Sequence, residues 1–285
     1  MDSTLVPLGE RSEPFTHYCD PDEIYAFALA INDDNPLYRD GLATPPTYVV
    51  VPVLQAFLTG LAPLPPEATA GARGGAHGEH DLYIRKPLMP GMTLHTTAER
   101  CAVVTSKAGM NVFTRLVSVD DAGETVVEQF WSTIMMGAAT GGSRGAEVPD
   151  HGFPEEARSN PVGTMWLPTT RDQTYRYAGA SGDRATIHVS DVAARSIGFP
   201  GKFNQGMCTL GVVSRALIAL AAGGDPRRVR RIAVRFASPS FPGQDIAVSV
   251  FDNGTTSEGS RSFAFEATSQ ESLILRHGRV EVEAP

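Results

Sequence analysis

The chain has 285 residues, of which 42% are hydrophobic and 20% charged, and its formal net charge is −8. These values are typical of a globular protein long enough for one large domain or two modest ones. The negative net charge argues against binding to nucleic acid, because such binding depends on neutralising phosphates with Lys and Arg.

Cysteine usage and the apolar stretches indicate the cellular compartment of the protein. The chain has three cysteines, namely Cys19, Cys101 and Cys208. They form no C-x-x-C pair and no zinc spacing, and so sparse a count indicates reduced thiols in a cytoplasmic protein. The first residues are polar and lack the basic-then-apolar pattern of a secretory signal. The longest apolar stretch, 48–64, is interrupted by two prolines and a glutamine, which predicts a core helix and no membrane span.

In chain order, the first half begins with a short helix over 21–32 and a polar loop that holds Asp33. A long apolar helix is expected over 47–61. Runs rich in Val, Phe and Thr follow, with Gly- and Asp-containing turns between them. We expect these runs to form strands at 81–84, 92–104, 110–120 and 125–136.

The second half has the same order of elements after a stretch rich in Gly, Ala, Ser and Pro at 137–161, which we expect to be an exposed linker. A helix is expected over 172–179, then a polar loop with Asp183, then a long apolar helix over 206–222. The expected strands are 231–237, 244–251, 262–268 and 273–283.

The two halves are copies of one module. DDNPLY at 33–38 corresponds to GDRATIH at 182–188, and KPLMPG at 86–91 corresponds to SPSFPG at 238–243. Both pairs are offset by about 150 residues, which makes chance similarity a poor explanation. A central helix followed by antiparallel strands is an α+β fold. We therefore predict a first module over 1–136, a linker over 137–161 and a second module over 162–285.

The second polar loop carries the strongest candidates for chemistry. Asp183 lies five residues before His188, and Gly206 opens the apolar helix. Five residues is not a same-face helical spacing, so an irregular loop must bring the two side chains together. An acid and a base that hold one water, beside a backbone N–H at a helix start, suit the addition of water next to a carbonyl. Taken alone, the pair is also compatible with a turn-capping aspartate and a surface histidine.

The segment 177–211, which reads YAGASGDRATIHVSDVAARSIGFPGKFNQGMCTLG, resembles the signature of the MaoC-like hydratases, the R-specific enoyl-CoA hydratase (hydratase 2) family. The resemblance covers most of residues 15–283. It departs where the family's Asn-Pro is Ala185-Thr186 and where its His before Gly206 is Gln205. The matching positions are Tyr177, Ser181, Gly182, Asp183, His188, Gly198, Phe199, Gly206, Met207, Cys208, Thr209 and Gly211.

The resemblance implies a double hot-dog fold, in which each module wraps an antiparallel sheet around its long helix. It implies a hydro-lyase that adds or removes water at the 2,3-position of an acyl thioester, with no metal and no cofactor beyond the carrier of the substrate. Asp183 and His188 would hold the water, and the N–H of Gly206 would bind the thioester oxygen. The departures are equally consistent with a bulky or unusual acyl group in a specialised pathway.

Four further residues are predicted to bind substrate. The amides of Asn204 and Gln205 lie beside Gly206 in the sequence, and Gln205 can donate and accept hydrogen bonds but cannot act as an acid or base. Lys202 and Arg230 could bind the phosphates of coenzyme A. The alternative for Arg230 is a solvated basic patch, since it belongs to a run of arginines: Arg227, Arg228, Arg230 and Arg231.

The first module is predicted to have lost its site. It keeps Asp33 but has Tyr38 where the histidine would stand. If Pro46 occupies the position of Gly206, no N–H is present there to bind an oxyanion. By resemblance, this module would complete the sheet and shape a cleft for the acyl chain.

Other functions remain open at this point. The same scaffold serves thioesterases, in which water attacks the carbonyl, and a non-catalytic acyl-thioester-binding subunit would also fit the departures. The cluster HGEH at 77–80 and His95 suggests a metal site, but the resemblance assigns no metal there. The expected partners are the acyl-thioester substrate, carried by coenzyme A or acyl carrier protein, and a second copy in a homodimer; no nucleic acid or membrane is expected.

Overall fold

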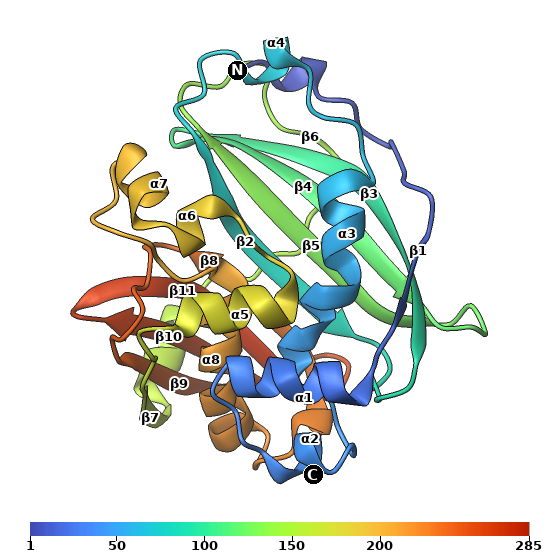
Figure 1. Cartoon of the computed structure of the whole chain (residues 1–285), viewed down its shortest axis with the longest axis vertical. Coiled ribbons are helices and arrows are strands. Elements are labelled where there is room, and N and C mark those ends of the chain that lie inside the picture. Colours follow the sequence, from blue (N-terminus) through green and yellow to red (C-terminus); the bar gives the residue numbers. More distant parts are fainter. Residues whose placement is uncertain (285) are drawn as a thin grey trace.

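Both halves of the chain contribute to one antiparallel sheet in this computed structural model, which describes residues 1–284 (Figure 1). The elements up to residue 145 are η1 (Ser3–Leu5), β1 (Phe15–Tyr18), α1 (Pro21–Ala30), α2 (Pro36–Arg39), η2 (Pro46–Val49), α3 (Val50–Thr59), α4 (Pro66–Thr69), β2 (Gly75–Ile84), β3 (Thr93–Ser106), β4 (Gly109–Val119), β5 (Thr125–Met136) and β6 (Arg144–Gly145).

The remaining elements repeat this order. They are η3 (Glu155–Ser159), β7 (Pro161–Leu167), α5 (Gln173–Ser181), α6 (Thr186–Val189), α7 (Asp191–Ser196), α8 (Gly206–Ala221), η4 (Pro226–Arg228), β8 (Val229–Phe236), β9 (Ile246–Thr255), β10 (Arg261–Ser269) and β11 (Ser272–Val282).

The strand order makes the repeat visible. It runs β1-β3-β4-β5-β2-β8-β11-β10-β9-β7, so each half supplies one side of the sheet and β2 meets β8 at the centre. Figure 1 shows α3 lying across the strands of the first half and α8 beside the strands of the second. The two helices share one hydrophobic core. In residues 1–284, no helix is both long and apolar enough to cross a membrane.

The two central helices differ because of proline. The helix expected at 206–222 is found as α8, whereas the one expected at 47–61 is split into η2 and the shorter α3. Pro45 and Pro46 precede this first helix and have no N–H, and the chain enters through a 3₁₀ turn. In α8, Gly211 allows a close approach to α1, because a Cβ at that position would lie only 2.6 Å from Cγ2 of Ile31.

An ion pair marks the seam where β2 meets β8. Asp81 pairs with Ala233 and Tyr83 with Arg231 in the antiparallel register. The guanidinium of Arg231 binds the carboxylate of Asp81 twice, with Nε–Oδ1 at 3.0 Å and Nη2–Oδ2 at 2.6 Å. Asp81 is 3% exposed and Arg231 is 6% exposed, so the pair that joins the two modules is almost completely buried.

The segment expected to be an exposed linker is partly packed against the sheet. β6 pairs with β3, so it extends the sheet of the first half. His151 is buried, donates from Nδ1 to the carbonyl oxygen of His277 at 2.8 Å, and lies 3.3 Å from Glu79 through Nε2. Glu79 also binds Arg235 of β8. The segment is therefore only in part the exposed linker that the sequence predicted, because these contacts hold parts of it against both modules.

This contact should make stability depend on pH. Burial opposes the charge on His151, but the bonds to Glu79 and to the His277 carbonyl outweigh it and raise the pKa of His151. Burial likewise opposes the charge on Glu79, and its bonds to His151 and Arg235 lower its pKa. The stabilisation from His151 is therefore complete below its unfolded pKa of about 6.5 and is lost as the pH rises through its folded pKa.

We expect His151→Gln to lower the melting temperature more at about pH 5.5 than at about pH 9. Circular dichroism melting curves of both proteins across this range measure the difference. A gap between the two melting temperatures that grows with pH would contradict the assignment.

Candidate active site

Asp183 lies in a tight loop that follows α5. The helix ends at Ser181, and Gly182 adopts the left-handed conformation, with φ at 79°. The hydroxyl of Ser181 donates to the carbonyl of Tyr177 at 2.8 Å and accepts from the N–H of Asp183 at 3.2 Å. The carboxylate of Asp183 accepts from the N–H of Ala185 through one oxygen at 3.2 Å. The loop therefore holds the Asp183 backbone firmly and leaves carboxylate lone pairs for a ligand.

His188 is held by its backbone neighbour. Its Nδ1 lies 2.8 Å from the carbonyl oxygen of Phe203, which can only accept, so Nδ1 carries the proton and Nε2 has the free lone pair. Burial lowers the pKa of His188, although the Phe203 carbonyl and Asp183 act in the opposite direction. The imidazole is consequently neutral near pH 7 and can accept a proton at Nε2.

Gly206 is the first residue of α8, so its N–H belongs to the first turn of the helix. Gln205, the preceding residue, makes no side-chain bond to the first turn. The first N–H groups of a helix have no partner inside it and carry the positive end of its dipole. A Cβ at Gly206 would lie 3.1 Å from the ring of Phe236 and 3.4 Å from Nδ1 of His77. Glycine, which has no Cβ, therefore lets the start of α8 pack closely against the rings of Phe236 and His77.

The amides of Asn204 and Gln205 are buried and bind protein groups. The Nε2 of Gln205 donates to the carbonyl oxygens of Thr174 at 3.2 Å and Asp183 at 3.1 Å. The Nδ2 of Asn204 donates to the hydroxyl of Ser240 at 3.0 Å. The side-chain oxygen of each amide has no hydrogen-bond partner among residues 1–284. Gln205 therefore anchors the Asp183 loop, and contact of either amide with substrate stays a prediction.

Two hydrogen bonds bring the three predicted catalytic residues into one unit. One joins His188 to Phe203, and the other joins Gln205 to Asp183. Both end within the three residues that precede Gly206. The loop between α5 and α8 thus folds back so that an acid, a base and a free helix N–H lie around the same short segment.

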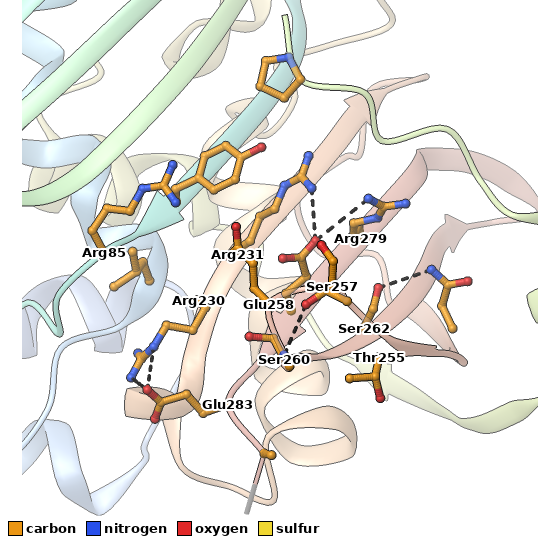
Figure 2. Close-up of a pocket in the computed structure, with 18 of the residues that line it drawn as sticks. Arg85, Arg230, Arg231, Thr255, Ser257, Glu258, Ser260, Ser262, Arg279 and Glu283 are labelled. Carbon is orange, nitrogen blue, oxygen red and sulfur yellow. Dashed lines mark hydrogen bonds and ion pairs between the residues drawn. The ribbon is translucent and has the colours of Figure 1, made fainter.

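The two predicted cationic residues lie in different places. The Nζ of Lys202 is 3.5 Å from Asp191 and 5.3 Å from the ring centre of Tyr175, so it is close to the α6–α7 segment. Arg230 pairs with Glu283 and lines an open groove of roughly 940 Å³ with Arg85 and Arg231 (Figure 2). Asp183, His188 and Gly206 are not among the residues that line this groove. The structure does not bring Arg230 together with them.

The corresponding place in the first module is closed. Asp33 accepts from the N–H of Asn35, and burial raises its pKa. The hydroxyl of Tyr38 is buried and has no hydrogen-bond partner in the described part of the chain. The cleft at Pro46 has a volume of about 20 Å³ and is lined mainly by prolines and aliphatic side chains, among them Ile84, Leu88 and Val229. Pro46 provides no N–H at the first position of η2, and no histidine or carboxylate is among the residues that line the cleft.

We expect Asp33→Asn to leave kcat/KM within about twofold of the wild-type value, because Asp33 has no partner that could activate water. Asparagine keeps the oxygen that accepts from Asn35. Steady-state kinetics with purified protein test this expectation. A large loss in a protein that keeps its melting temperature would place the reaction in the first module.

The histidines at 77–95 do not converge on a metal-like site. His77 and His80 lie 3.3 Å apart, while His95 binds Asp121. In residues 1–284, no group of three or more His, Cys, Asp or Glu side chains is arranged to hold a metal ion. The sequence did not predict the position of His77 beside Gly206, because 129 residues separate the two along the chain.

Comparisons with known proteins show the family of the chain. Residues 154–272 match the model of the MaoC like domain, and residues 28–137 match that of the MFE-2 hydratase 2 N-terminal domain. The 3-hydroxyacyl-thioester dehydratase Y of Mycobacterium tuberculosis is 30% identical over 73% of this chain and 72% of that protein. The peroxisomal multifunctional enzyme type 2 of Drosophila melanogaster is 31% identical over 82% of this chain, which spans 41% of that relative's length.

Solved structures share the fold. A MaoC-like dehydratase from Phytophthora capsici has a TM-score of 0.82 at 24% identity, covering 96% of this chain and 97% of that one. A Mycobacterium tuberculosis protein described as a double hot-dog fold has a TM-score of 0.62 at 13% identity, covering 97% and 96%. Together with the strand order, these likenesses confirm the predicted double hot-dog fold.

Proposed function

This chain belongs to the family of MaoC-like dehydratases and hydratase 2 enzymes, and from that premise we propose that it adds and removes water across the 2,3-bond of an acyl thioester. The observation that carries the proposal is the pair of hydrogen bonds that ties Asp183 and His188 to the residues before Gly206. A hydro-lyase needs two groups that hold water and one donor for the carbonyl oxygen.

In the proposed reaction, a water lies between the carboxylate of Asp183 and Nε2 of His188. Its oxygen bonds to C3 of the enoyl thioester, while one of its protons passes to the pair. The pair returns a proton to C2 on the same face, so no net charge is gained or lost. Because the same groups serve both directions, substrate concentrations decide between hydration and dehydration.

The N–H of Gly206 would bind the thioester oxygen. Negative charge builds on this oxygen as the bond at C3 forms, and a donor that is already in place needs no reorganisation. The positive end of the α8 dipole adds to the stabilisation. Loss of one such donor typically lowers the rate by about 10²–10³-fold.

Hydration neither oxidises nor reduces the substrate, so we propose that the residues of the chain suffice without a metal or redox cofactor. Coenzyme A or acyl carrier protein would carry the acyl group, with Lys202 beside the α6–α7 segment available to a phosphate. The free, buried thiols of Cys19, Cys101 and Cys208 support a reducing compartment such as the cytoplasm.

Absorbance of the conjugated enoyl thioester tests the proposal. We expect the purified protein to remove this absorbance from at least one of a set of short, long and branched enoyl-CoAs, without release of free thiol. Release of thiol at the rate of the reaction would indicate a thioesterase. Tight binding of the enoyl-CoAs without turnover would indicate a binding subunit.

A further inference from the structure

A side chain of the first module reaches the catalytic residues of the second. Nδ1 of His77, in β2, lies 3.4 Å from the place that a Cβ on Gly206 would occupy. His77 is half-buried as a residue and its ring packs against Phe236 of β8, with ring centres 4.4 Å apart. His77 and Phe236 therefore form the wall beside the N–H at the start of α8.

A chain of hydrogen bonds determines which nitrogen of His77 is protonated. The amide nitrogen of Gln129 donates to the carbonyl of Val49 at 3.1 Å, so its oxygen faces His80 and accepts from Nε2 at 3.0 Å. Burial lowers the pKa of His80 to about 4, so His80 is neutral and its Nδ1 must accept. The partner at 3.3 Å is Nε2 of His77, which consequently donates.

The remaining nitrogen of His77 is therefore an acceptor. Burial and the neighbouring His80 lower the pKa of His77 well below its usual value, although a hydrogen bond with the Glu79 backbone acts in the opposite direction, so the ring is neutral. Its Nδ1 carries a lone pair on the side of Gly206. A donor N–H and an acceptor nitrogen thus lie side by side at the start of α8.

Stacked rings hold His77 in this orientation. The ring of Trp131 lies 4.2 Å from that of His77 at an interplanar angle of 8°, and Phe57 stacks on the other side of Trp131 at 4.2 Å. Ring stacking of this kind limits rotation about the side-chain bonds. The lone pair is therefore already oriented before a ligand arrives.

The closed cleft of the first module offers an internal comparison. There, Val229 of β8 and Pro46 line the same small cleft, whereas His77 of β2 lies beside Gly206. Valine has no acceptor and proline has no N–H. The first module therefore lacks both the N–H donor and the acceptor. The second module, which holds Asp183 and His188, has both.

We propose that Nδ1 of His77 accepts a hydrogen bond from the amide N–H of the substrate's pantetheine arm, and that His77 is thereby a binding residue contributed by the first module. The inference rests on the proposed function, which puts the thioester oxygen at Gly206. The sulfur then lies beside the first turn of α8, and two methylene groups separate it from an amide that coenzyme A and acyl carrier protein share. A partly buried amide N–H needs an acceptor, because leaving it without one is costly.

Two small thioesters of the same enoyl group test this contact. One carries N-acetylcysteamine, which ends in the amide, and the other carries 2-acetoxyethanethiol, in which an ester oxygen replaces the N–H. We expect wild-type kcat/KM to be about tenfold higher for the amide, mostly through KM. Equal values for the two substrates would overturn the proposal without any variant. If neither these thioesters nor any enoyl-CoA is hydrated, the proposed function fails and this inference fails with it.

A variant then locates the contact. His77→Phe keeps a stacked ring but removes the acceptor, so the ratio of kcat/KM for the amide to kcat/KM for the ester should fall from about tenfold to about one. Trp131→Phe is the matched control, because it keeps both an aromatic ring beside His77 and the acceptor Nδ1, so the preference for the amide should remain. An undiminished preference for the amide in His77→Phe would overturn the assignment to His77, as would an equal loss on both substrates.

Discussion

Asp183→Asn and His188→Asn should each lower kcat by about 10²–10⁴-fold while the protein stays folded. Asparagine at 183 keeps an oxygen for the N–H of Ala185 but cannot take a proton from water. Asparagine at 188 can still donate to the carbonyl of Phe203 from its amide nitrogen, but it lacks Nε2. Each variant therefore removes one half of the water-holding pair and preserves the local hydrogen bonds.

The measurement is steady-state hydration of an enoyl-CoA, with melting curves to verify folding. Asp33→Asn is the matched control, because it makes the same change at the corresponding position of the first module. Near wild-type activity in either active-site variant would show that the pair does not carry the reaction. If the losses of the two single variants add in the double variant, the proposal that the pair acts as one unit is also contradicted, because the effects of residues that act as one unit are not additive.

The second large effect is on stability. Asp81→Ala should lower the free energy of unfolding by about 3 kcal/mol, because it leaves the buried Arg231 without its bidentate partner. The loss should lie at the lower end of the usual range, since Glu281 remains 3.1 Å from Nη1 of Arg231. The break also falls at the seam between β2 and β8, where the two modules pair.

Chemical denaturation followed by fluorescence measures this loss. Asp121→Ala is the control, because its carboxylate is exposed and, among residues 1–284, its ion pair is with His95 alone, so the change should alter stability by less than about 1 kcal/mol. Equal effects of the two substitutions would mean that the seam pair contributes no more than a surface pair does.

The sequence predicted the parts of the fold that local patterns determine. The long apolar run at 206–222 appears as α8, and the strand expected at 125–136 appears with the same bounds as β5. The short strands β1 and β7 were not predicted, because four and seven residues at the edges of a sheet carry little periodic signal. The first part of β2 reads as a glycine-rich loop, and its pairing with β5 contains a register shift between His77 and His80.

The sequence predicted residues for the candidate site but not the contacts that those residues make. Asp183, His188 and Gly206 came from a short matched segment, and the chain brings them together as one unit. That Gln205 anchors Asp183, and that His77 lies against Gly206, depends on tertiary packing between distant segments. No local pattern encodes such contacts, which is also why the packed position of His151 was not expected.

The fate of the water oxygen tests the central claim most directly. A 3-hydroxyacyl thioester and its enoyl partner are brought to equilibrium with the protein in water labelled with ¹⁸O, and the products are examined by mass spectrometry. The account predicts label at the C3 hydroxyl of an intact thioester, at a rate that Asp183→Asn abolishes. Label in a free carboxylate, together with released thiol, would contradict it.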